Sequence, residues 1–334
     1  MEYNFLGKTN LQVSKICLGT MHFGKLTDEK EAFCIMDKAL DLGINFFDTA
    51  NIYGRPRGES EIIIGNWFQK HKKRNKVVLA TKGYQGMDVD KGTMYPNEGH
   101  LTSALKVRRD IEGSMKRLQT DHIELYQTHH IDRRVSVEEF WNAFDKIIEK
   151  DYATYIGTSN FPGWALTKFQ AAAKQRGKIG IASEQHMYNL LCRYPELEVL
   201  PAALDNGIGV LPYMPLSGGL LTGKTITSAG ERTNEVAVEY GIDYEKNERI
   251  IAFNKLCAEM GEKPATVATA WVLANPAVSS VIIGVRTLKH LDEVERMSTL
   301  KLDESMIKTL NDMFPISEGR KLKNNLPIPE CYAW

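Results

Sequence analysis

The chain has 334 residues, 43% of them hydrophobic, and its 42 Lys and Arg residues balance its 42 Asp and Glu residues. This hydrophobic fraction is typical of a globular protein and excludes a disordered one. Zero net charge disfavours a general nucleic-acid binder, so no nucleic-acid partner is expected. The first ten residues lack the apolar segment of a signal peptide and no run of 18 apolar residues occurs, so we expect neither export nor a transmembrane helix.

Short apolar or β-branched runs recur along the chain, as is typical of strands buried on both faces. They predict strands at 16–18, 45–48, 77–81, 123–127, 155–159, 181–185, 208–212 and 280–283. Amphipathic stretches between them predict helices at 28–42, 59–69, 103–118, after Ser136, and at 164–176, 197–206, 265–274 and 288–297. Asp28 with Glu31, and Ser136 with Glu139, have the spacing of capping boxes, and Gly43 ends the first helix.

Eight strands, each followed by a helix, favour a closed (β/α)8 barrel formed by one domain over residues 1–334. An open, doubly wound sheet is the alternative. Two extra helices are expected near 244–260 and 303–313, and the turn residues at 7–10 predict an N-terminal β-hairpin. The longest irregular stretches are 85–101, 217–240 and 318–334. Loops this long in compact domains are usually either functional or disordered.

The five cysteines are far apart and form no C-x-x-C pair; they are Cys17, Cys34, Cys192, Cys257 and Cys331. This usage indicates reduced thiols rather than a disulfide framework or a zinc site. We also find no HExxH or other dense cluster of metal ligands. The sequence therefore predicts a cytoplasmic protein with no metal site.

In a barrel of this kind, reactive residues lie where strands end. Asp48 follows the second predicted strand, with Tyr53 in the next loop, and Lys82 and His129 follow the third and fourth strands. A free tyrosine has a pKa near ~10, which a neighbouring Lys⁺ lowers. An aspartate would keep that lysine charged, and a neutral histidine could orient a carbonyl. Together these residues indicate proton delivery to a carbonyl oxygen.

Four stretches make the chain similar to the aldo-keto reductases: GINFFDTANIYG at 43–54, ATK at 80–82, LYQTH at 125–129 and IGTSNF at 156–161. The similarity runs almost end to end, from LGKT at 6–9 to PECYAW at 329–334. It implies a barrel enzyme that reduces the carbonyl of a small molecule to an alcohol with NADP(H). It also implies a catalytic tetrad of Asp48, Tyr53, Lys82 and His129, in which Tyr53 donates the proton and His129 orients the carbonyl.

The same resemblance implies where cofactor and substrate bind. The nicotinamide half would meet Gly19, Thr20, Met21, Asp48, Ser159, Asn160, Gln185 and Tyr213. Leu216, Gly218, Leu220, Thr222 and Lys224 would wrap the pyrophosphate, and Gly284, Arg286, His290 and Glu293 would meet the adenosine end and its 2′-phosphate. The substrate would meet Phe23, Tyr84, His130 and Trp334. Because barrels often bind phosphate after strands seven and eight, and because Arg286 can fork onto a phosphate, NADP(H) is favoured, with NADH as the alternative.

Three alternatives remain beside a broad carbonyl reductase. The tail at 329–334 is similar to that of bacterial relatives, some of which reduce nucleotide-linked deoxysugars. Other relatives are regulatory subunits of membrane channels, which predicts a bound cofactor with little turnover. The third is an NTPase, since GGLLTGKT at 218–225 matches the phosphate-loop pattern, but Pro212 and Pro215 interrupt the approach that such a loop needs. No G-x-G-x-x-G occurs, so no Rossmann unit is expected. The sequence predicts no oligomeric state.

Overall fold

The computed structural model describes residues 1–87, 97–99, 102–223 and 246–316. In this part of the chain, eight parallel strands form one sheet in the order β10-β3-β4-β5-β6-β7-β8-β9. The strands are β3 (Ile16–Gly19), β4 (Phe46–Asp48), β5 (Val78–Gly83), β6 (Ile123–Thr128), β7 (Ala153–Ser159), β8 (Ile181–Met187), β9 (Gly209–Tyr213) and β10 (Val281–Gly284). The predicted eight strands are confirmed, with ends that differ by a few residues at most.

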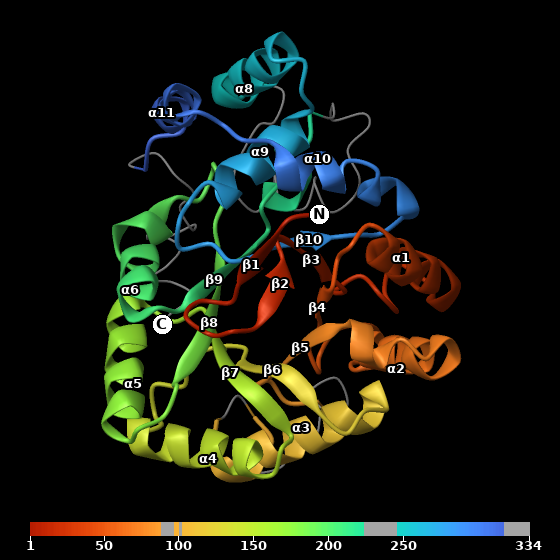
Figure 1. Cartoon of the computed structure of the whole chain (residues 1–334), viewed down its shortest axis with the longest axis vertical. Helices are drawn as coiled ribbons and strands as arrows, with labels where there is room; N and C mark the ends of the chain where they lie inside the picture. The colour runs from red at the N-terminus through yellow and green to blue at the C-terminus, as the bar shows by residue number, and fades with distance from the viewer. Residues whose placement is uncertain (88–96, 100–101, 224–245, 317–334) are drawn as a thin grey trace.

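The sheet closes on itself between its two outer strands. The amide of Val210 on β9 donates to the carbonyl of Ala277 at 2.8 Å, and the amide of Ser279 donates back to Val210 at 2.9 Å. The predicted (β/α)8 barrel is therefore confirmed, and the helices surround it (Figure 1).

Eight helices follow the barrel strands: α1 (Glu29–Asp41), α2 (Glu59–His71), α3 (Ala104–Leu118), α4 (Val137–Glu149), α5 (Gly163–Gln175), α6 (Val199–Asn206), α9 (Pro264–Leu273) and α10 (Val294–Thr299). Among the described residues, two additional helices are present, α8 (Glu248–Glu259) and α11 (Glu304–Met313). The described part of the chain also contains four short 3₁₀ turns: η1 (Arg74–Lys76), η3 (Tyr194–Leu197), η4 (Ser217–Gly219) and η6 (Leu288–Leu291).

The helix caps explain where the helices begin. Asp28 and Ser136 accept from the backbone amides of Glu31 and Glu139, at 2.8 and 3.1 Å, as predicted. The predicted continuous helix at 288–297 is wrong: the segment is divided into η6 and α10. The reason is local, because Thr287 caps η6 and the side chain of His290 turns back to bond the capping residue.

An antiparallel hairpin, β1 (Tyr3–Phe5) and β2 (Gln12–Ser14), covers one end of the barrel and confirms the predicted N-terminal addition (Figure 1). Leu6 and Val13 of this hairpin are fully buried against residues that fill the barrel interior, among them Phe46 and Leu125. The hairpin approaches closely because Gly7 has φ +56° and lacks a side chain; a Cβ there would lie 2.5 Å from the carbonyl oxygen of Gly207. The opposite end, where the strands terminate, stays available for a site.

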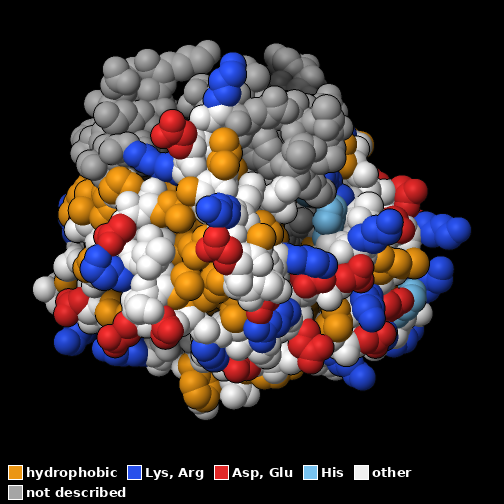
Figure 2. All heavy atoms as spheres, turned by 90° about the horizontal axis from the view of Figure 1, so that it is seen from above, with side chains coloured by type: hydrophobic (Ala, Val, Ile, Leu, Met, Phe, Trp, Pro, Cys, Tyr) orange, Lys and Arg blue, Asp and Glu red, His pale blue; other side chains and the backbone are white. Residues whose placement is uncertain are grey.

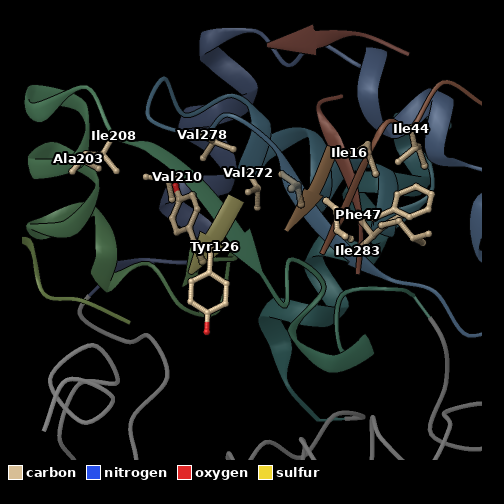
Figure 3. Close-up of a cluster of buried hydrophobic side chains, with 14 of the residues drawn as sticks. Ile16, Ile44, Phe47, Tyr126, Ala203, Ile208, Val210, Val272, Val278 and Ile283 are labelled. Carbon is tan, nitrogen blue, oxygen red and sulfur yellow. The ribbon is translucent and has the colours of Figure 1, made fainter. Parts of the chain in front are cut away.

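A second, larger core lies between the sheet and its helices. Figure 3 shows part of it, where Ile16, Phe47 and Ile283 come from neighbouring strands and pack with Ile44. On the face seen in Figure 2, Lys and Arg side chains are interspersed with Asp and Glu. Among the described residues, no helix is long and apolar enough to cross a membrane. The four cysteines in the described part, Cys17, Cys34, Cys192 and Cys257, are free thiols.

Candidate active site

The catalytic residues proposed from the sequence meet at the end of the barrel opposite the hairpin. Asp48 is the last residue of β4, Lys82 lies near the end of β5, and His129 directly follows β6. Tyr53 lies in the loop after β4, five residues beyond Asp48. Because the strands are parallel and in register, their carboxyl ends converge on one rim.

A buried ion pair forms the centre of this site. The Nζ atom of Lys82 donates to Oδ1 of Asp48 at 2.6 Å and to the carbonyl oxygen of Thr49 at 2.7 Å. The side chain of Lys82 has no exposed surface and that of Asp48 is 3% exposed. Such a pair is costly to desolvate and is retained only with good geometry and further hydrogen bonds, both of which are present here.

Tyr53 and His129 lie over this pair. The Nζ atom of Lys82 is 5.0 Å from the centroid of the Tyr53 ring, and the rings of Tyr53 and His129 meet edge to face at 5.9 Å. Both Tyr53 and His129 are only partly buried as residues, in contrast to the fully buried Lys82. The pair therefore lies below, and the two rings face the open end of the barrel.

Protonation in the site follows from burial and the ion pair. Burial raises the pKa of Tyr53, the positive charge of Lys82 opposes this, and the net direction is upward. The net lowering expected from the sequence is thus not found, because burial is the larger effect. Burial lowers the pKa of Lys82, but Asp48 and Tyr53 outweigh it, so the ammonium stays charged. Burial, with the charges of Lys82 and His130, lowers the pKa of His129 to about 3, so this ring is neutral at neutral pH.

Next to the tetrad lie the residues that the resemblance assigns to the nicotinamide. Asn160 has φ +58°, and its Oδ1 accepts a hydrogen bond from the hydroxyl of Tyr213 at 2.9 Å. Its Nδ2 donates to the carbonyl of His129 at 3.2 Å and to Oγ of Ser159 at 3.1 Å. Gln185 donates to Oδ2 of Asp48 at 3.0 Å. These bonds involve residues at the ends of five strands, β4, β6, β7, β8 and β9, around one rim.

Three residues at the end of the first barrel strand, Gly19, Thr20 and Met21, differ in their exposure. Thr20 is fully buried, and its hydroxyl donates to the carbonyl of Asp48 at 3.0 Å and accepts from Ser60 at 2.9 Å. Its side chain therefore holds β3 and β4 together. Gly19 is buried, whereas Met21 is 42% exposed. Contact of these three residues with a ribose stays a prediction.

The loop after β9 has unusual backbone geometry. Gly218 and Gly219 have φ +69° and +110°, and Ser217 has φ +48°. Thr222 donates to the carbonyl of Gly219 at 2.7 Å, Leu220 is fully buried, and Leu216 is partly buried. Lys224, the last residue assigned to the pyrophosphate, lies outside the described residues.

Arg286 follows β10 and is held from two sides. Its amide donates to Nδ1 of His290 at 3.1 Å, and its carbonyl accepts from Thr27 at 3.0 Å. Nδ1 of His290 is thus used for capping. Glu293 pairs with Lys263 on the outer surface. Gly284 is exposed at the end of β10, with only the side chain of His22 near the position of an added Cβ.

The proposed substrate residues divide into three groups. Tyr84 and His130 stack with ring centroids 5.8 Å apart beside the tetrad. Phe23 has no exposed surface and packs in the core between sheet and helices, so its contact with substrate stays a prediction. Trp334 lies outside the described residues.

The sequence reasoning assigned no role to Gln127. This residue is fully buried on β6, and its Nε2 donates to Oδ2 of Asp48 at 3.1 Å. A signal was present, because Gln127 lies two residues before His129 and therefore on the same face of the strand. Among the described residues, no group of three or more His, Cys, Asp or Glu side chains is arranged to hold a metal ion.

Comparison of the sequence with known proteins identifies one family. The model of the Aldo/keto reductase family matches residues 15–314. The chain belongs to this family. As an aldo-keto reductase, it is 51% identical over 342 aligned residues to an uncharacterized oxidoreductase of Bacillus subtilis, and the alignment covers 100% of both chains.

Two more distant relatives carry more specific names. The chain is 31% identical to the versiconal hemiacetal acetate reductase of Aspergillus parasiticus, over 94% of this chain and 97% of the relative. It is also 31% identical to a probable voltage-gated potassium channel subunit beta of Arabidopsis thaliana, over 91% of this chain and 95% of the relative. The family and its oxidoreductase members support carbonyl reduction as the general activity of this aldo-keto reductase.

Proposed function

We propose that this aldo-keto reductase uses NADPH to reduce the carbonyl group of a small aldehyde or ketone to an alcohol, with Tyr53 as the proton donor. The observation that carries the proposal is the buried Asp48–Lys82 pair directly below the Tyr53 ring. This arrangement keeps a positive charge next to the phenol of Tyr53.

Each residue of the tetrad has one task in the proposed reaction. Tyr53, protonated at neutral pH, donates its proton to the carbonyl oxygen as that oxygen gains charge. Lys82 then stabilises the phenolate, and Asp48 keeps Lys82 charged. His129 is neutral, so it can donate a hydrogen bond to the carbonyl oxygen and orient it. The nicotinamide cofactor, when bound, supplies the hydride to the carbonyl carbon.

The chain's own residues fit a phosphorylated dinucleotide. The backbone of Arg286 is fixed on both sides, by the side chains of His290 and Thr27. A planar guanidinium carried on this fixed backbone suits a phosphate group. At the nicotinamide end, Asn160 and Gln185 present amide groups beside the tetrad. Arg286 is the reason to prefer NADPH over NADH.

Replacing Tyr53 with Phe tests the proposal, because it removes only the hydroxyl. General acid catalysis contributes roughly 10²–10⁴-fold, so Tyr53→Phe should lose at least that much turnover of a generic aldehyde. Binding of NADPH, followed by the change in protein fluorescence, should stay within a few-fold of the wild type. Turnover at the wild-type level in this variant would overturn the assignment of the proton donor.

The similarity to a probable potassium channel subunit beta supports a second candidate, a regulatory subunit that holds the cofactor with little turnover. Steady turnover of generic aldehydes with NADPH separates the two functions. The same assay, applied to a panel of aldehydes, ketones, sugars and a nucleotide-linked 4-keto sugar, tests the narrower proposal of a nucleotide-deoxysugar reductase. The tail that suggested such a substrate lies outside the described residues. A single domain and a cytoplasmic location stay predictions.

A further inference from the structure

The second carboxylate oxygen of Asp48 has partners of its own. While Oδ1 faces Lys82, Oδ2 accepts from Nε2 of Gln127 at 3.1 Å and from Nε2 of Gln185 at 3.0 Å. The two amides also contact each other, with Nε2 of Gln185 3.4 Å from Oε1 of Gln127. Two strands, β6 and β8, thus hold the same oxygen of a residue on β4.

Packing fixes the side chain of Gln127 in this position. The residue has no exposed surface, and its backbone pairs with Lys82 on one side and Gly157 on the other. A Cβ at Gly157 would lie 2.8 Å from Cγ of Gln127 and 2.5 Å from Oγ of Ser183. The absence of a side chain at Gly157 therefore makes room for the glutamine.

Gln127 and Gln185 are not equivalent, although they bond the same atom. Gln185 is one of the residues placed at the nicotinamide, whereas Gln127 touches neither that group nor the substrate in the proposed function. Gln127 is thus the donor to Oδ2 of Asp48 to which the proposed function assigns no ligand. Hydrogen bonds from neutral donors to a carboxylate stabilise its charged form and fix its orientation.

We propose that Gln127 is a positioning residue: it orients the Asp48 carboxylate toward Lys82 and thereby keeps the Lys82 charge beneath Tyr53. This inference rests on the proposed function, in which Tyr53 donates the proton. It predicts that kcat depends on the hydrogen-bond donor at position 127 and not only on the volume of the side chain.

Two substitutions separate donor from volume. Gln127→Leu keeps similar bulk and removes the donor, and it should lower kcat about ten- to a hundred-fold, as expected for loss of a buried hydrogen bond to a charged group. Gln127→Glu keeps the shape, but its carboxyl lies next to that of Asp48, so the two share a proton at low pH. In its protonated form Glu donates as Gln does. The kcat of this variant should therefore approach that of the wild type at low pH and fall with a new titration as pH rises.

A measurement in the cofactor-free protein tests the inference without relying on catalytic turnover. The titration of Tyr53 is measured from tyrosinate absorbance, as the difference between each protein and its Tyr53→Phe counterpart. Above the titration of the shared pair, Gln127→Glu adds a negative charge close to Asp48, and the Tyr53 midpoint should rise by about one pH unit or more. Gln170→Leu is the matched control. Gln170 bonds only the backbone of Ile179 and Ile181, so its loss should affect stability without moving the pH profile or the Tyr53 midpoint.

The possible results discriminate clearly. A wild-type kcat and pH profile in Gln127→Leu, or a Gln127→Glu profile with no new titration, overturns the inference about Gln127. A loss in Gln127→Leu that Gln170→Leu reproduces overturns it as well, because a general structural effect would then suffice. If Tyr53→Phe is inactive while the Gln127 variants behave as the wild type, only this inference fails. If Tyr53→Phe is fully active, the proposed function fails first.

Discussion

Replacing Asp48 with Asn would leave the most deeply buried charge of the site without its counter-ion. Lys82 has no exposed side-chain surface, and its Nζ lies 2.6 Å from the Asp48 carboxylate. After the substitution, the carbonyl of Thr49, at 2.7 Å, would remain as an acceptor. The folded variant must then either hold an unpaired ammonium or release its proton.

The cost of releasing that proton depends on pH in a predictable way. An ordinary lysine has a pKa of about 10.4, so deprotonation at pH 7 costs about 5 kcal/mol, and at pH 10 it costs less than about 1 kcal/mol. The first value agrees with the roughly 3–5 kcal/mol found when one partner of a buried pair is removed. We therefore expect Asp48→Asn to lower the free energy of unfolding by about 3–5 kcal/mol at pH 7 and by much less at pH 10.

Urea unfolding followed by tryptophan fluorescence at both pH values measures this difference. The double variant Asp48→Asn/Lys82→Met is the control, because it removes both charges and should recover most of the stability at pH 7. The reasoning would be refuted by an equal loss at pH 7 and pH 10, or by a double variant no more stable than Asp48→Asn alone.

Three further predictions test other parts of the molecule. His129 has a pKa of about 3 in the folded protein and about 6.5 unfolded, so the unfolded chain takes up a proton first as pH falls. Stability should drop from about pH 6.5 toward pH 3 with up to ~1.4 kcal/mol per pH unit from this ring, and His129→Asn, followed by urea unfolding at stepped pH, should show a shallower slope. Gly7 and Gly177 have φ +56° and +66°, but an added Cβ meets backbone at 2.5 Å only at Gly7 and nothing within 4 Å at Gly177. Gly177→Ala should thus lower the free energy of unfolding by about 1–2 kcal/mol, and Gly7→Ala should lower it by at least about 1–3 kcal/mol more, as measured by thermal unfolding. Equal losses in the two variants would contradict the close approach of the hairpin. Arg286→Ala should raise the KM for NADPH far more than that for NADH, whereas equal effects would refute the phosphate assignment.

Much of the barrel was predictable because its elements are encoded locally. Buried strands read as short apolar runs, and helix starts read as capping patterns such as Asp28 with Glu31. The prediction of one continuous helix at 288–297 was wrong because the apolar residues of this segment have helical spacing throughout. The turn at its start is set by the His290 side chain bonding back to the backbone, which periodicity does not show.

The candidate site was partly predictable for a different reason. Parallel strands end at one rim, so residues just beyond them, such as Asp48, Lys82 and His129, could be grouped without coordinates. The sequence did not indicate which further residues hydrogen-bond to Asp48. Gln127 and Thr20 illustrate the limit, since one proved to bond the Asp48 carboxylate and the other its backbone carbonyl.

The sequence by itself determined the alternation of strands and helices, the hairpin at the N-terminus and the residue types available at the rim. These features depend on the spacing of residue types along the chain, because helices, strands and turns form from interactions between residues that are close in sequence. Only the tertiary structure decided the protonation of the site. The pKa values of Tyr53, Lys82 and His129 depend on their burial and on charges at the ends of three strands, β4, β5 and β6. Both effects arise only when the folded barrel brings these strands together. The net upward direction of the Tyr53 pKa, opposite to the one that its lysine neighbour alone suggests, is the clearest result of that closure.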